Sequence, residues 1–151
     1  MTLHVTGAQE LAALAGTHLP PTAWLQVDQA MVNAFARITG DEQWIHIDAQ
    51  RAKSGPFGAT VAHGFLTLSL LPRFWHEAVA VGGFGAAVNY GLNRVRFPAP
   101  LLVPSRVRAR LRVEEVRETG TAMQVALHSS IERESGDKAV CVAEAVFRYY
   151  F

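Results

Sequence analysis

The segment from His63 to Leu71 constrains the fold of this chain more than any other part of the sequence. It is almost wholly apolar, and its large residues are Phe65, Leu66, Leu68, Leu70 and Leu71. A helix that is hydrophobic on all sides is typical of a protein interior, where other elements cover every face. We therefore expect one buried central helix, which Pro72 kinks or ends because proline cannot continue the hydrogen bonding of a helix interior.

The second half of the chain has the two-residue period of strands that bury one face. Residues 106–113 alternate arginine with an apolar residue, and residues 123–131 place an apolar residue or serine at every second position. Residues 139–149 are apolar on both faces, and residues 86–97 predict a further strand that bends at Gly91. Helices followed by long antiparallel strands indicate an α+β domain, with the sheet wrapped around the central helix. Such a sheet leaves an edge or an apolar face for a partner subunit.

The first half of the chain predicts short helices with recognisable ends. Asp28 is a suitable N-cap for a helix over residues 29–38, and Gly40 is a suitable end for it. The apolar residues Met31, Ala34, Phe35 and Ile38 share one face of this helix. Residues 24–28 predict a short strand, residues 48–53 a turn of helix opened by Asp48, and residues 7–15 a short helix.

The composition fits one compact domain. The chain has 151 residues, of which 50% are hydrophobic and 18% charged, as in globular proteins. We expect a single domain over residues 1–151, with residues 1–19 as a helical extension. The formal net charge of +1 gives no argument for nucleic acid or an anionic membrane surface as a partner.

Location and cofactors follow from what the sequence lacks. It shows no basic segment before an apolar one at its start and no uncharged apolar run of about 18 residues, so we expect a cytoplasmic protein. The single cysteine, Cys141, excludes an internal disulfide, and its apolar neighbours predict a buried thiol. The run Gly82-Gly-Phe-Gly85 lacks the spacing of a nucleotide-binding loop, and we expect no cofactor.

Asp41 and His46 form the first candidate site. They lie five residues apart beside Gly40, and the alternation at residues 44–47 predicts an extended, partly buried piece that could bring both side chains to one pocket. Imidazole can take a proton and return it near neutral pH, while a carboxylate orients the ring or carries a second proton. The alternative is turn chemistry at Asp41 and a buried structural histidine at His46. The spacing of His46, Asp48 and His63 matches no standard zinc pattern, so we expect no metal.

His63 and Gly64 form the second candidate site, at the start of the predicted central helix. A helix N-terminus presents free N–H groups and the positive end of a dipole, and glycine allows a ligand carbonyl to approach closely. Such a place can stabilise an oxygen that becomes negative during a reaction. The alternative is a helix start where a small residue is needed only for packing.

Taken together, these motifs resemble the MaoC-like dehydratase family, also called R-specific enoyl-CoA hydratases or hydratase 2. The resemblance rests on the following residues: Gly40-Asp41, His46-Ile47-Asp48, Ala52, Phe57-Gly58, Val61-Ala-His-Gly64, Leu66, Ser69 and the run from Asn89 to Pro100. The segment from Gly40 to His46 is most similar to the nodulation-protein-N-like branch. Many family members carry Asn-Pro where this chain has Gln43-Trp44.

The resemblance implies a hot-dog fold and a homodimer that joins two sheets, with the active sites at the subunit interface. It also implies a hydro-lyase that adds water to a trans-2-enoyl thioester, of coenzyme A or of an acyl-carrier protein, to give an (R)-3-hydroxyacyl thioester, and that catalyses the reverse. Asp41 and His46 would hold one water, with His46 as base and Asp41 in proton delivery to C2, or with the roles exchanged.

The other site residues are implied in the same way. The N–H of Gly64, with His63 beside it, would bind the thioester oxygen, Ser69 would line the acyl pocket, and Asn89 would form part of the pocket wall. Two alternatives remain open at this point: a hot-dog thioesterase and a non-catalytic acyl-thioester-binding subunit. The arginines of residues 106–112 predict a solvated outer strand face, with a coenzyme A phosphate site as the alternative.

Overall fold

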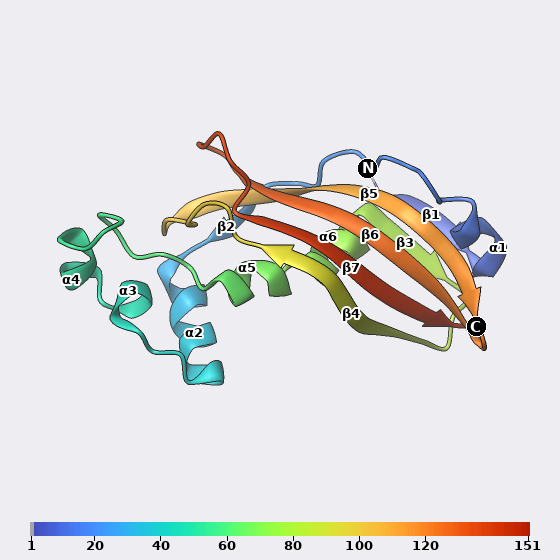
Figure 1. Ribbon diagram of the computed structural model, residues 1–151, viewed down its shortest axis with the longest axis horizontal. Coiled ribbons are helices and arrows are strands. Elements are labelled where there is room, and N and C mark those ends of the chain that lie inside the picture. The colour runs from blue at the N-terminus through green and yellow to red at the C-terminus, as the bar shows by residue number, and fades with distance from the viewer. Residues whose placement is uncertain (1) are drawn as a thin grey trace.

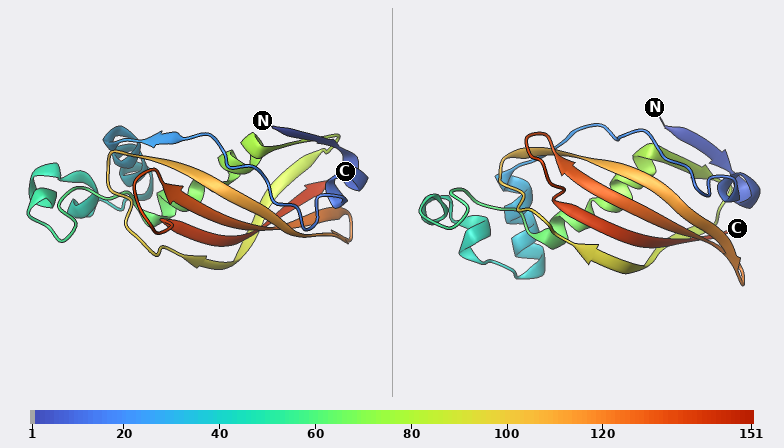
Figure 2. Two further views of the ribbon diagram at one scale, coloured as in Figure 1. Left: turned by 90° about the horizontal axis from the view of Figure 1, so that it is seen from above. Right: turned by 45° about the horizontal axis from the view of Figure 1, so that its top comes forward.

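A five-stranded antiparallel sheet curls around two short helices in the computed structural model, which describes residues 2–151 (Figure 1). The strand order is β2-β5-β6-β7-β4. The strands are β2 (Leu25–Val27), β4 (Ala86–Arg96), β5 (Ser105–Thr119), β6 (Ala122–Arg133) and β7 (Cys141–Tyr150). The helices α5 (Gly64–Ser69) and α6 (Leu71–Ala78) lie along the concave face of the sheet (Figure 2). This arrangement confirms the predicted α+β class and the hot-dog fold.

The concave face of the sheet carries the apolar set that the alternation predicted. Val107, Val113, Val125 and Ile131 are fully buried, and the thiol of Cys141 is buried as expected. Strand β4 has register shifts on both sides of Gly91, which agrees with the predicted bend. The period of two therefore fixed which face of each long strand turns inward.

Trp75 and Tyr149 join the central helix to the sheet. The indole Nε1–H of Trp75, on α6, donates a hydrogen bond of 2.6 Å to the hydroxyl of Tyr149, on β7. Both side chains are at most 1% exposed. Burial raises the pKa of Tyr149, against the opposite effect of the bond from Trp75. A polar pair in the core thus satisfies the one donor that the indole carries.

The central helix is interrupted where the proline predicts it. Helix α5 is capped at Leu70, and α6 begins at Leu71 with Pro72 in its first turn. The missing N–H of proline costs little there, because the first turn of a helix has no internal acceptors for its N–H groups. Pro72 therefore starts the second helical piece and ends the first.

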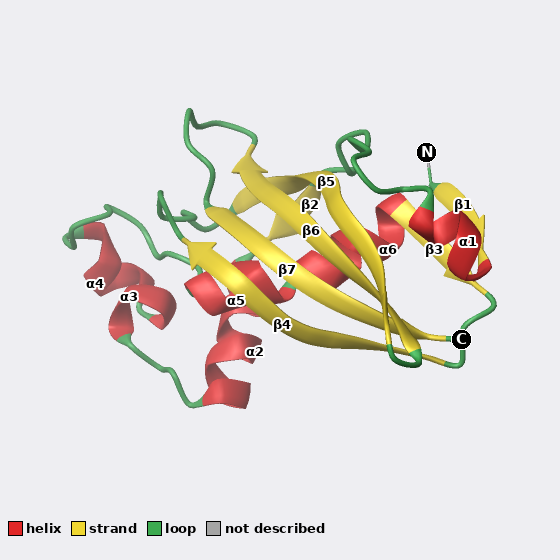
Figure 3. Cartoon of the chain, turned by 45° about the vertical axis from the view of Figure 1, so that its right-hand side comes forward, coloured by secondary structure: helices red, strands yellow, loops and turns green. Residues whose placement is uncertain are grey.

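The expectation that the central helix is covered on every side is wrong for one face of α5. Phe65 is 70% exposed, and Ser69 is exposed as well. Strand β4, which neighbours this face, is one of the two edge strands of the sheet and is itself exposed over nearly all its length (Figure 3). One chain therefore leaves a face of its own central helix without a cover.

The beginning of the chain contains the short helix predicted over residues 7–15 and a strand that the sequence did not reveal. Strand β1 (Leu3–Thr6) pairs in parallel with β3 (Val79–Gly82), and helix α1 (Gly7–Ala12) follows β1. Strands of four residues are too short for a two-residue period to become visible. The expected helical extension thus contains a strand as well as a helix, and its Leu11 is fully buried in the common core.

Three helices form a projection beyond one end of the sheet, which we call the overhang (residues 29–53). They are α2 (Gln29–Thr39), α3 (Trp44–Ile47) and α4 (Ala49–Lys53). The predicted ends of α2 are confirmed, since Asp28 Oδ1 accepts the N–H of Met31 and Gly40 has a left-handed φ of 75°. The predicted apolar face of α2 is only partly buried, because Ile38 is 84% exposed. Within residues 2–151, no helix has the length and apolar character needed to cross a membrane.

Candidate active site

His46 lies on a helical turn, so the prediction of an extended piece at residues 44–47 is wrong. The N–H of Asp48 donates to the carbonyl of Trp44, and Asp48 then caps α4 by accepting the N–H of Arg51. A run of four residues is too short to separate a helical period from a strand period. The helical turn places His46 on its inner side, where the residue is 7% exposed.

The ring of His46 is held in one tautomer by the backbone. Its Nδ1 lies 2.6 Å from the carbonyl oxygen of Val61. A carbonyl oxygen can only accept, so Nδ1 carries the proton and donates it, which leaves the lone pair of Nε2 free. When the ring is neutral, it can therefore accept a proton at Nε2.

The backbone of α3 is held by a second set of polar contacts. Gln29 Nε2 donates to the carbonyl oxygen of His46 at 2.7 Å, and the hydroxyl of Thr60 donates to Gln29 Oε1 at 2.6 Å. No pattern in the sequence points to Gln29, Thr60 or the carbonyl of Val61. Each lies 15 to 31 residues from its partner along the chain, and no local spacing reports such a pair.

Asp41 follows the left-handed Gly40 at the end of α2, and its side chain is 56% exposed. A carboxylate oxygen of Asp41 and a ring nitrogen of each of His46 and His63 lie within 4.8 Å of one another. One water can bridge two groups at this separation, because two hydrogen bonds of about 2.8 Å each span a larger distance. The structure thus brings Asp41 and His46 together as the spacing suggested.

The side chain of His63 contacts both Asp41 and His46. Its Nε2 is 2.8 Å from the backbone oxygen of Asp41, and its ring stacks on the ring of His46 with centroids 3.8 Å apart and planes at 23°. Phe35 also packs against the ring of His63, at a centroid distance of 5.0 Å. The residue is 2% exposed, and its Nδ1 is a buried polar atom with no partner within the described residues.

Gly64 is the first residue of α5 and lies against an aromatic ring. A Cβ built on Gly64 would be 3.0 Å from Cδ2 of Phe97. Phe97 in turn meets the exposed Phe65 edge to face, with ring centroids 6.3 Å apart. Close packing therefore gives one reason for a glycine here, in agreement with the packing alternative that the sequence left open.

Ser69 and Asn89 both line a cavity of about 360 Å³ between the central helix and strands β4 and β7. The other lining residues are mainly apolar: Phe65, Leu68, Leu71, Pro72, Gly91, Leu92, Ala145, Val146 and Phe147. The hydroxyl of Ser69 donates to the carbonyl of Leu66 at 2.8 Å. Asp41, His46 and Gly64 do not line this cavity, so the structure separates the predicted residues into a candidate catalytic corner and a neighbouring apolar cavity.

The side chains of Asp41, His46 and His63 have a geometry that fits a metal site poorly. A zinc ion needs nitrogen lone pairs that converge at about 2.0–2.1 Å from the metal. The lone pairs of imidazole lie in the ring plane, and the planes of His46 and His63 are stacked, so their nitrogens do not point at one centre. One nitrogen of each ring is also engaged with a carbonyl oxygen. The arrangement is better suited to proton transfer.

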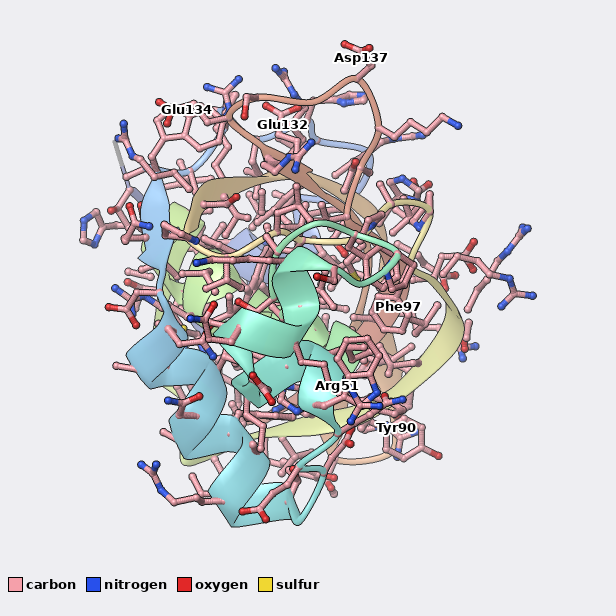
Figure 4. All side chains as sticks on the ribbon, turned by 90° about the vertical axis from the view of Figure 1, so that its left-hand side faces the viewer. Arg51, Tyr90, Phe97, Glu132, Glu134 and Asp137 are labelled. Carbon is pink, nitrogen blue, oxygen red and sulfur yellow. The ribbon has the colours of Figure 1, made fainter. Side chains whose placement is uncertain are left out.

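The arginine row on β5 is paired with glutamates on the outer face of the sheet. Arg106 lies 2.8 Å from Glu134, and Arg110 lies 2.9 Å from Glu132. The hydrogen bond from Arg110 lowers the pKa of Glu132, against the effect of partial burial. Glu132 and Glu134 are labelled near the top of Figure 4, and Arg51 of the overhang is labelled lower in that view. The row is therefore a solvated, charge-compensated face, as the sequence favoured.

The chain is similar in sequence and fold to several known proteins. Residues 10–134 match the family described as MaoC like domain. The chain is 49% identical to 3-hydroxyacyl-thioester dehydratase Z of Mycobacterium tuberculosis, over 93% of both chains. It is 34% identical to nodulation protein N of Rhizobium meliloti, over 93% of this chain and 89% of that one. The fold superposes on the monoamine oxidase regulatory protein of an Archaeoglobus with a TM-score of 0.74, at 22% identity and 90% coverage of both chains.

Proposed function

Since the chain belongs to the MaoC-like dehydratase family of hydro-lyases, we propose that it catalyses the (R)-specific hydration of trans-2-enoyl thioesters and the reverse dehydration. The substrate is an acyl thioester of coenzyme A or of an acyl-carrier protein. The observation that carries this proposal is the fixed tautomer of His46 with a carboxylate of Asp41 close by. A base and a second proton-carrying group beside one water are what the addition of water to a polarised double bond requires.

The reaction proceeds as follows in this proposal. His46 Nε2 takes a proton from the water that Asp41 helps to hold, and the water oxygen forms a bond to C3 of the enoyl thioester. The electron pair of the double bond moves to the thioester oxygen, which the N–H of Gly64 stabilises as it becomes negative. The proton that His46 has taken then passes to C2 through Asp41. Enoyl thioester and water thus give the 3-hydroxyacyl thioester, and both side chains return to their starting state.

The acyl chain lies in the cavity beside Ser69 and Asn89 in this proposal. Its apolar lining suits a hydrocarbon chain, since burial of each methylene contributes about 0.8 kcal/mol. The exposed ring of Phe65 belongs both to this lining and to the uncovered face of α5. A group that covered this face would therefore also close the cavity.

A second copy of the chain is the partner that we propose for this face. Strand β4 is an unpaired sheet edge, and it exposes Val88, Tyr90 and Leu92 by 42%, 57% and 46%. Exposed strand edges with apolar side chains favour pairing with another strand. A homodimer that joins two sheets along β4 would bury these residues together with Phe65. Elution of the protein as a monomer at micromolar concentration in a gel-filtration column with light-scattering detection would contradict this.

The activity is tested by adding the protein to crotonyl-CoA and following the absorbance of the enoyl thioester. We expect the absorbance to fall and chiral analysis to find the (R)-3-hydroxy product. The same assay with longer enoyl chains, on coenzyme A and on a carrier protein, identifies the preferred substrate. Release of free thiol without hydration would instead indicate a thioesterase, and the absence of any turnover on all substrates would indicate a non-catalytic binding subunit.

A further inference from the structure

We propose that His63 is a positioning residue that fixes the backbone of Asp41 and the ring of His46 relative to each other, and that it does not itself bind the substrate. This inference rests on the proposed function of Asp41 and His46. It reassigns His63, which the family resemblance had placed beside the thioester oxygen. The structure offers three separate observations that bear on this role: a hydrogen bond, a stacking contact and the burial of the ring.

The hydrogen bond fixes the backbone of Asp41. The oxygen at 2.8 Å from His63 Nε2 is the main-chain carbonyl of Asp41, so Nε2 carries the proton and donates it. Asp41 itself lies in an exposed stretch between α2 and α3, where few other contacts define its position. Within the part of the chain that the structure describes, Asp41 makes one other hydrogen bond, in which its N–H donates to the hydroxyl of Thr39 at 3.3 Å. The bond from His63 is therefore the main link between Asp41 and the protein interior.

The stacking contact fixes the ring of His46. The bond from Nδ1 to the carbonyl of Val61 still allows the imidazole to tilt about the N–H···O line. The ring of His63, at a centroid distance of 3.8 Å and nearly parallel, limits this tilt. Phe35 also packs against the ring of His63, at a centroid distance of 5.0 Å, so the histidine contacts two other rings. One buried side chain thus contacts both members of the catalytic pair.

Burial and tautomer explain why the role is positional. His63 is 2% exposed, and the nitrogen that faces Asp41 already donates to a carbonyl. The remaining nitrogen, Nδ1, carries no proton in this tautomer and cannot donate to a thioester oxygen. A proton at Nδ1 would also place a positive charge against the ring that takes the proton from water. A neutral His63 is thus compatible with a charged His46 during the reaction.

Two substitutions separate the two contacts. His63→Phe keeps a ring that can stack on His46 but removes the donor to Asp41, whereas His63→Gln keeps an amide donor and loses the ring. We expect each variant to lower kcat by about 10- to 100-fold, as for other residues that orient a reactive group, with KM changed by less than about twofold. His76→Gln, at an exposed position of α6, serves as the matched control and should leave kcat unchanged.

A double-mutant cycle provides the readout that a general loss of structure would not give. If His63 acts only through the pair, then adding His63→Phe to His46→Gln should cost little further activity, because effects of residues that act as a unit are not additive. Additive losses, a rise in KM at constant kcat, or full activity of both single variants would each overturn the inference.

A measurement on the wild-type protein keeps this test separate from the test of the proposed function. Nitrogen-15 NMR of the histidine rings should find His63 protonated at Nε2 and His46 protonated at Nδ1. If the protein hydrates no enoyl thioester but shows these tautomers, the proposed function fails and the arrangement stands. The opposite tautomer at His63 in an active enzyme would contradict the positioning role alone.

Discussion

The sheet and the overhang are held in place by different kinds of contact. Along the concave face of the sheet, many equivalent apolar contacts repeat from strand to strand, and residues such as Val107, Val125 and Ile131 are fully buried. The candidate catalytic corner, where the overhang meets α5, is held by a few directional contacts, such as the bond of 2.6 Å between His46 Nδ1 and the carbonyl of Val61. Stability should therefore depend mainly on the sheet, and activity on the corner.

The sharpest way to test this difference is to change the corner alone. His46→Gln and Asp41→Asn should each lower the hydration rate by about 100- to 10,000-fold, because each removes a group that moves or holds a proton. The unfolding temperature should change little, since Asp41 is largely exposed and glutamine is close to histidine in size. Steady-state kinetics and thermal unfolding measure the two effects. Full activity in either variant would contradict the assigned mechanism.

The converse test changes the sheet alone. Ile131→Ala on β6 should destabilise the protein by about 2–5 kcal/mol, because it removes a fully buried side chain and leaves a cavity. The kcat of the fraction that remains folded should stay close to that of the wild type. Chemical denaturation together with active-site titration measures both quantities. A large loss of kcat in fully folded Ile131→Ala would show that the corner and the sheet are coupled.

A smaller effect is expected from the polar contact between the central helix and the sheet. Tyr149→Phe removes the acceptor of the Trp75 indole and leaves a buried N–H without a partner. The expected cost is about 1–3 kcal/mol of unfolding free energy, as for other unsatisfied buried donors. Trp75→Phe in the Tyr149→Phe background is the matched control, since it removes the orphaned donor. A Tyr149→Phe variant as stable as the wild type would show that water or another group satisfies the indole.

The smallest expected effect is on the reactivity of the buried thiol of Cys141, at the start of β7. Burial raises the pKa of the Cys141 thiol to about 11, so the folded protein favours the protonated form. Its contribution to stability is complete below the pKa of an unfolded cysteine and is lost as the pH rises toward about 11. At pH 8 the native thiol should react with a disulfide reagent far more slowly than the thiol of the unfolded chain. Equal rates in the two states would show that the sheet opens readily at β7.

Regular patterns made much of the fold predictable. The alternation of residues 106–113 reported the inner face of β5 correctly, because each strand residue faces the side opposite to its neighbours. Asp28 and Gly40 marked the ends of α2 because capping and left-handed backbone are local properties. The short strands β1 and β3 and the helical turn α3 were not predicted, since each has four residues and shows no clear period.

The sequence by itself determined the candidate acid and base, the apolar central helix and the strands that enclose it. Only the tertiary structure decided how these residues act together. The carbonyl of Val61 selects the tautomer of His46, and His63 reaches from the start of α5 to the backbone of Asp41 and to the ring of His46. The partners in these contacts are 15 to 22 residues apart in the chain. Their meeting depends on how the overhang folds back against α5, and no spacing within the sequence encodes that.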